Sequence, residues 1–161
     1  MTAPAARTLL LALGNDILGD DGVGFAAARE IGARFGDGVE VVCSSEAGLA
    51  LIEHMEGFPR ALLLDAIVTG RAPVGTVHEF APRDFRRVLA PSPHYAGLPE
   101  ILDLAERLQL EFPSELRVLA IEVEDPYEIR EGLTPGVERA LPAFVARAAE
   151  ILESWGCTST A

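Results

Sequence analysis

The sequence of 161 residues is long enough for one domain and too short for two of ordinary size, so we expect a single domain over residues 1–161. Its composition, 49% hydrophobic and 24% charged residues, is typical of a globular protein. The formal net charge is −12, and all 13 basic residues are arginine. This balance argues against nucleic acid or an anionic membrane as a partner, and the absence of lysine excludes Schiff-base and P-loop chemistry.

We expect neither a leader peptide nor a membrane span. Arg7 is followed by only six apolar or small residues, and no stretch approaches the roughly 20 apolar residues that a spanning helix needs. Cys43 and Cys157 are too far apart for a secreted disulfide scaffold. We interpret them as a buried small residue and a tail residue, and we expect a cytoplasmic protein. The oligomeric state is not predicted.

Apolar runs bounded by turn residues alternate along the chain with segments of helical periodicity. The continuous runs predict buried strands at residues 8–13, 39–43, 61–64 and 116–121. Helical spacing predicts helices at 23–35, 47–55, 99–110 and 135–155, with Thr134 as the N-cap of the last helix and Pro142 as a kink or a helix start within it. The tail, residues 156–161, is expected to fray.

A further strand is predicted at residues 74–80. Only about ten residues separate it from the preceding strand, too few for a helical crossover, so we expect an antiparallel edge strand. The whole order of elements predicts an α/β fold. We expect a single open twisted, mostly parallel five-stranded sheet with helices on both faces and one antiparallel edge strand.

Chemically capable side chains follow three of the predicted strands. Asp21 ends a glycine-rich loop after the first strand, Asp65 follows three leucines, and His94 lies in the segment after the edge strand. Ligands of open α/β sheets bind at the carboxyl ends of the strands. Two carboxylates and one imidazole there suit a borderline divalent ion such as Ni²⁺, Zn²⁺ or Fe²⁺. A charge such as Asp65 within an apolar run is costly unless it is paired or coordinated.

The glycine-rich loop also permits two other interpretations. Gly14 and Gly19 have the spacing of a phosphate-binding loop, but Asp20 and Asp21 stand where Lys and Ser or Thr belong, and their charges would repel phosphate. The same two carboxylates are also suited to capping the helix that follows. One acid capping and the other binding a cation would satisfy both roles.

The remaining candidates for catalysis are weaker. His54 and His78 are most simply solvent-facing, since one lies among glutamates and the other alternates with apolar residues. Neither Cys43 nor the pair Ser44-Ser45 has an evident histidine and acid arrangement, and nearby glutamates would raise the pKa of a Cys43 nucleophile.

Four motifs, taken together, resemble the [NiFe]-hydrogenase maturation endopeptidases. They are the segment 14–24, which reads GNDILGDDGVG, Asp65-Ala66, Ser92-Pro93-His94 and Gly132-Leu133-Thr134-Pro135. The resemblance covers roughly residues 8–152. It implies a five-stranded α/β sheet and a protease that removes a short C-terminal extension from the hydrogenase large-subunit precursor after nickel insertion, with the precursor's nickel as the recognised feature.

The resemblance also implies site residues. The family's metal-contacting positions fall on Asp21, Asp65 and His94, which we therefore expect to be both catalytic and metal-binding, with nickel supplied by the precursor. Asp16 or Asp20 is a candidate general base. The sequence departs from the family at Ser44-Ser45-Glu46, where relatives carry a small pair of residues. Glu46 would either add a carboxylate near the substrate or cap a helix.

Two rival functions remain, and the first of them uses the same three residues. A non-enzymatic nickel-binding chaperone would bind metal without cleaving a peptide, and a nucleotide-binding module would use the glycine-rich loop. The acidic run at residues 122–131 is either a solvated loop or a frame for the groove in which the precursor docks.

Overall fold

The computed structural model describes residues 7–87, 94 and 97–160, and for residues 85–87 it describes the backbone alone. Its strands are β1 (Thr8–Leu13), β2 (Glu40–Ser44), β3 (Arg60–Ile67), β4 (Val77–Phe80) and β5 (Glu115–Glu122). Its helices are α1 (Val23–Phe35), α2 (Leu51–Met55), α3 (Leu98–Arg107) and α4 (Pro135–Ser154). The strands form one sheet in the order β2-β1-β3-β5-β4, in which β4 alone is antiparallel to its neighbour. The predicted fold class is therefore confirmed.

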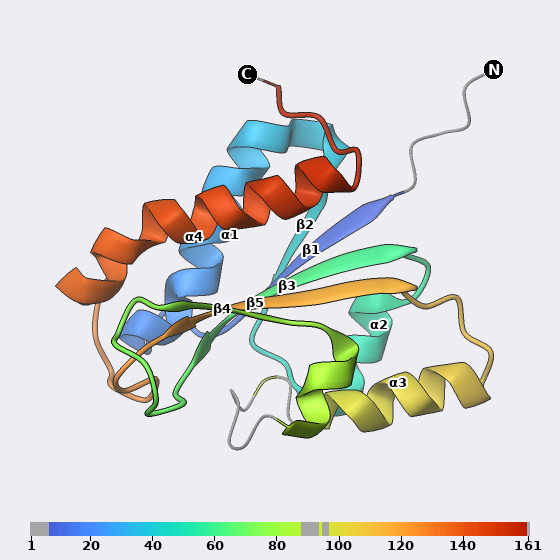
Figure 1. Ribbon diagram of the computed structural model, residues 1–161, viewed down its shortest axis with the longest axis horizontal. Helices are drawn as coiled ribbons and strands as arrows, with labels where there is room; N and C mark the ends of the chain where they lie inside the picture. The colour runs from blue at the N-terminus through green and yellow to red at the C-terminus, as the bar shows by residue number, and fades with distance from the viewer. Residues whose placement is uncertain (1–6, 88–93, 95–96, 161) are drawn as a thin grey trace.

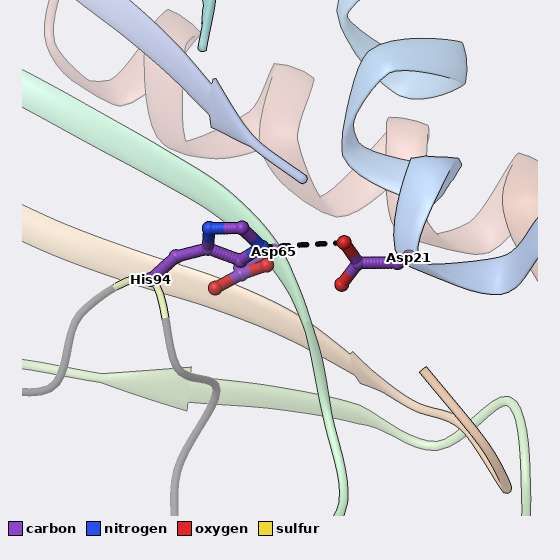
Figure 2. Close-up of side chains that lie close together, drawn as sticks. All are labelled: Asp21, Asp65 and His94. Carbon is purple, nitrogen blue, oxygen red and sulfur yellow. Dashed lines mark hydrogen bonds and ion pairs between the residues drawn. The ribbon is translucent and has the colours of Figure 1, made fainter. Parts of the chain in front are cut away.

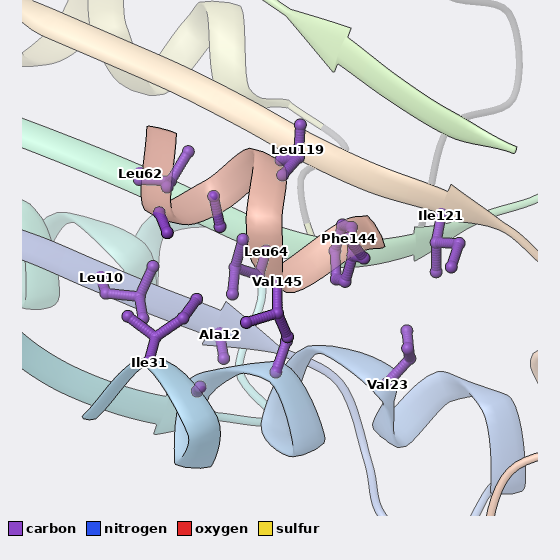
Figure 3. Close-up of a cluster of buried hydrophobic side chains, with 14 of the residues drawn as sticks. Leu10, Ala12, Val23, Ile31, Leu62, Leu64, Leu119, Ile121, Phe144 and Val145 are labelled. Atoms are coloured by element: carbon purple, nitrogen blue, oxygen red, sulfur yellow. The ribbon is translucent and has the colours of Figure 1, made fainter. Parts of the chain in front are cut away.

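Helices cover both faces of the sheet, with α1 and α4 on one side and α2 and α3 on the other (Figure 1). Every residue of β1 is buried, which explains its continuous apolar run, because a parallel strand packed on both faces has no solvent side. Leu10 and Ala12 face the α1 and α4 side, where they pack with Leu64 and Phe144 (Figure 3). Leu9, Leu11 and Leu13 pack on the opposite face.

Several element bounds differ from the predicted ones. β3 continues to Ile67, so Asp65 lies inside the strand rather than after it. The helix expected at 47–55 is a single 3₁₀ turn, Gly48–Ala50, followed by the short α2. α4 is one helix through Pro142, so no second helix starts there.

The carboxyl-terminal segment, expected to fray, is instead held against the rest of the molecule. The backbone nitrogen of Cys157 donates to Leu152 at 3.0 Å, and its side chain packs against the core beside α1 and α4. Thr160 donates two hydrogen bonds to the carbonyl of Arg34 at the end of α1, 2.8 Å from its nitrogen and 3.1 Å from its hydroxyl. These contacts join the tail to α1.

Cys43, which we expected to be buried, is exposed. It lies in β2, at the edge of the sheet, where only one neighbouring strand covers the backbone. Across the parts of the chain that the structure describes, no helix combines the length and apolar character needed to cross a membrane.

Candidate metal centre at the carboxyl edge of the sheet

Asp65 is the deepest member of the candidate site. It lies near the end of the central strand β3, between β1 and β5, and its exposed fraction is 0%. Its Oδ1 accepts a hydrogen bond of 2.8 Å from the backbone nitrogen of Ala66. The strand thus places a carboxylate inside the apolar layer, where a charge requires partners or a cation.

Asp21 lies in a 3₁₀ turn, Gly19–Gly22, that joins the loop after β1 to α1, and it too is buried. The glycine at position 14 makes room for this turn, because a Cβ atom there would collide with the carbonyl oxygen of Asp21. Gly24, in the first turn of α1, also packs closely on the sheet, because a Cβ atom there would lie 3.0 Å from the carbonyl oxygen of Leu64 and 3.1 Å from that of Leu13. The glycine-rich sequence therefore brings Asp21 against the ends of β1 and β3.

His94 reaches the two carboxylates from the segment before α3 and is itself buried. Its Nε2 lies 3.2 Å from Oδ2 of Asp21. The hydrogen bond with Asp21 raises the pKa of His94 above its ordinary value. Burial acts in the opposite direction, and the charge of Asp65 adds to the increase. The neighbouring Ser92 and Pro93 of the sequence motif lie outside the described residues.

The structure thus brings together all three predicted site residues (Figure 2). One ligand atom from each of Asp21, Asp65 and His94 lies within 4.8 Å of the others, and all three side chains are buried. Two carboxylate oxygens and one imidazole nitrogen are donors that fit a borderline divalent cation. Two buried acids beside one histidine also leave a surplus of negative charge that a cation would neutralise.

Asp20 has a different role from its neighbour. Its Oδ1 accepts a hydrogen bond from the backbone nitrogen of Thr134, its Oδ2 accepts one from the hydroxyl, and both distances are 2.7 Å. Asp20 therefore binds Thr134, the residue just before α4, instead of capping α1, the helix that follows it. Because both of its oxygens are engaged, it is poorly suited to act as a general base, whereas Asp16 is exposed at the same edge.

The loop that carries Asp21 is also paired with the segment after β5. An isolated parallel bridge joins Leu18 and Arg130. Arg130 donates its backbone nitrogen to Ile17 at 3.2 Å and accepts from the nitrogen of Gly19 at 3.1 Å. Together with Asp20, these bonds fix the loop from two sides. They leave buried carboxylates where a phosphate cradle would need donors, which counts against the nucleotide-binding interpretation.

The other two histidines are partly buried and paired, contrary to the expectation that they face solvent. His78 lies 2.8 Å from Oε2 of Glu122, which also accepts hydrogen bonds from Thr69 and Gly70. Sequence reasoning missed Glu122 as a buried acid. Glu122 follows the apolar residues of β5, much as Asp65 follows the leucines of β3. An acid directly after a buried apolar run is the pattern that could have identified it.

His54 contacts both Ser44 and Glu46, the residues at which the sequence departs from the family pattern. Its Nε2 lies 2.7 Å from Oε2 of Glu46 and 3.2 Å from Oγ of Ser44. A nucleophilic relay needs the acid on one ring nitrogen and the hydroxyl on the other. Because both contacts here use the same nitrogen, this cluster does not form such a relay.

Comparisons with known proteins agree with this fold. A family model described as hydrogenase maturation protease matches residues 28–151, a stretch that includes Asp65 and His94. The hydrogenase 2 maturation protease of Escherichia coli K12 is 32% identical over 155 residues, 92% of each chain. The hydrogenase expression/formation protein HupD of Rhizobium leguminosarum bv. viciae is 28% identical over 98% of this chain and 80% of its own.

A solved structure of similar fold is the hydrogenase-maturating endopeptidase HybD from Escherichia coli. It matches with a TM-score of 0.81 and 28% identity, over 95% of this chain and 96% of that chain. The fold and this likeness define the protein as an endopeptidase. With the family model covering most of its length, the chain belongs to the hydrogenase maturation protease family.

Proposed function

We propose that this protease removes the C-terminal extension of a [NiFe]-hydrogenase large-subunit precursor after nickel has been inserted. The nickel carried by the precursor is the feature that it recognises. Asp21, Asp65 and His94 are the residues proposed to contact that nickel and to orient the peptide bond that is cut.

The observation that carries the proposal is the buried cluster of three ligand atoms within 4.8 Å of one another. Three protein ligands are fewer than a closed structural site uses, so such a centre leaves positions for ligands from the precursor. The site also lies at the carboxyl edge of the sheet, where open α/β folds bind their ligands. A cation that arrives with the substrate is therefore compatible with both the donors and their place.

The chain's own residues would bind the nickel and position the peptide bond that is cut. Asp65 is fixed by the central strand, Asp21 by the two-sided hydrogen bonding of its loop, and His94 by its contact with Asp21. Nickel held by these side chains would either polarise the scissile carbonyl or act only as a template for orientation. Asp16, exposed at the same edge, is the carboxylate left to serve as a general base.

The proposal is tested by incubating the purified protein with nickel-loaded and with nickel-free precursor and following the mass of the large subunit. We expect the mass of the extension to be lost only from the nickel-loaded precursor. Equal cleavage of both forms would contradict nickel recognition. Cleavage of neither would contradict the proposed reaction.

The non-enzymatic nickel chaperone is not favoured, because the family model and the Escherichia coli relatives carry protease names. The two functions differ in a calorimetric titration with nickel. A chaperone should bind nickel tightly as the isolated chain and release no peptide from the precursor. The protease proposed here must release that peptide.

A further inference from the structure

The large apolar side chains left exposed are concentrated at the edge of the sheet that holds the candidate metal centre. Within the described residues there are seven of them, and six follow or precede strands at this carboxyl edge: Ile17, Leu49, Val68, Val74, Tyr127 and Ile129. The seventh, Leu108, lies beyond the end of α3 near the start of β5, at the opposite edge. Apolar exposure concentrated in this way marks an interaction surface.

The most exposed members lie beside one another because two loops are paired. The bridge between Leu18 and Arg130 makes Ile17 and Ile129 neighbours in register, and their exposed fractions are 63% and 83%. Tyr127 lies two residues before Ile129 in the same segment. The paired loops, in blue and orange, lie together at the left of Figure 1. We call Ile17, Tyr127 and Ile129 the apolar triplet.

The apolar triplet is joined to the candidate metal centre through short, hydrogen-bonded backbone. Ile17 and Asp21 belong to the same loop, and Asp20 attaches that loop to Thr134 beyond Ile129. A protein seated on the triplet therefore stands at a fixed position relative to Asp21. Such a surface is preorganised, because these hydrogen bonds already hold its backbone.

The surroundings of the apolar triplet are acidic. Arg130 is the single basic residue among residues 122–131. The exposed carboxylates that flank the triplet in the two loops are Asp16, Glu124, Asp125, Glu128 and Glu131. Acidic rims of this kind select a partner with complementary positive charge and accelerate its association. The partner that fits is a polypeptide surface with exposed apolar side chains flanked by arginine or lysine.

We propose that the apolar triplet and its acidic rim form the docking surface for the hydrogenase large-subunit precursor. It would contact a basic and apolar patch beside the precursor's nickel. This inference rests on the proposed function, which supplies the partner. It adds that recognition has a second component, separate from nickel, that acts on affinity rather than on bond cleavage.

The test uses Ile17→Asp and Ile129→Asp, with Leu108→Asp as the matched control because Leu108 is 59% exposed at the opposite edge. All three positions are on the surface, so unchanged thermal unfolding is expected and is checked first. If the precursor docks on the triplet, each isoleucine substitution should raise the KM for the nickel-loaded precursor about tenfold or more, as at interface hot spots. The kcat should be retained. Values within twofold of those of Leu108→Asp would overturn the docking surface.

A binding measurement separates failure of this inference from failure of the proposed reaction. Nickel-loaded precursor is immobilised, and its affinity for wild type and variants is measured at low and high salt without reference to cleavage. We expect binding by wild type that weakens with salt and weakens further in the isoleucine variants. A wild type that binds in this way without cleaving would retain the docking surface and refute the reaction. Absence of wild-type binding would overturn the docking surface.

Discussion

Asp20 accepts two hydrogen bonds of 2.7 Å from Thr134, one from its backbone nitrogen and one from its hydroxyl. The pair joins residues that are 114 positions apart in sequence. It connects the turn that holds Asp21 to the residue directly before α4. The position of the candidate metal ligand therefore depends on a contact made by its neighbour.

Replacing Thr134 with valine tests this contact. Thr134→Val removes the hydroxyl donor and leaves a buried carboxylate oxygen of Asp20 unsatisfied, which should lower the free energy of unfolding by about 1–3 kcal/mol. Cleavage should slow as well, because Asp21 loses its support. Urea unfolding measures the first effect. Thr160→Val is the control, since that hydroxyl bonds to Arg34 at an exposed site, and equal stabilities of the two variants would contradict the role given to Thr134.

Two glycines of α1 should respond differently to replacement by alanine. A Cβ atom at Gly24 would lie 3.0 Å from the carbonyl oxygen of Leu64 and 3.1 Å from that of Leu13, so the helix must move away from the sheet. We expect Gly24→Ala to lose about 1–3 kcal/mol of stability, as overpacked sites do.

At Gly32 the nearest atom is a methyl group of Val41 at 3.6 Å, an ordinary contact. Gly32→Ala should therefore be neutral or stabilise α1 by up to about 1 kcal/mol, because alanine loses less backbone freedom on folding. Thermal unfolding of both variants measures these two changes in stability. Similar losses from both would show that close packing at Gly24 is not the cause.

Glu122 predicts a pH dependence of stability. Burial acts to raise the pKa of its carboxyl, but hydrogen bonds from Thr69, His78 and Gly70 outweigh burial, and the pKa lies below its ordinary value of 4.5. A carboxyl with a depressed folded-state pKa stabilises the fold above the unfolded-state value of about 4.5. That contribution is lost as the pH falls through the lower folded-state value.

Glu122→Gln should accordingly reduce stability by about 1–3 kcal/mol at neutral pH. The difference from wild type should shrink below pH 4.5 or so. Urea titrations between neutral and acid pH measure it. Glu124→Gln, which alters an exposed acid two residues away, serves as the control. A deficit that stays constant down to the acid range would refute the electrostatic origin.

Much of the fold was predictable because its strands are buried on both faces. The run at residues 8–13 has no polar residue between Leu9 and Leu13, and β1 occupies those bounds. The rule that ligands bind at carboxyl ends also placed Asp21 and Asp65 together, because β1 and β3 are parallel neighbours whose ends meet at one edge. It does not account for His94, because the strand before it, β4, is antiparallel and its last residue, Phe80, pairs with Val118 rather than with the carboxyl end of β5.

The parts that escaped prediction depend on contacts between distant segments. His78 alternates with apolar residues, but its environment is set by Glu122 on the adjacent antiparallel strand. Asp20 was interpretable as a cap of α1, yet both of its carboxylate oxygens bind Thr134, the residue before α4. The exposure of Cys43 follows from the position of β2 at the edge of the sheet, and strand order is not encoded in a local pattern.

Asp65→Asn tests whether the buried cluster recognises precursor nickel, because it removes one charge at nearly constant volume. The measurement is the rate at which nickel-loaded precursor loses its extension, followed by mass, with Asp103→Asn on α3 as the exposed control. We predict a rate reduced at least about 100-fold. Loss of a residue that only supports a ligand costs up to about 100-fold, and loss of a ligand itself should cost no less. A rate equal to that of Asp103→Asn would contradict nickel recognition by the cluster.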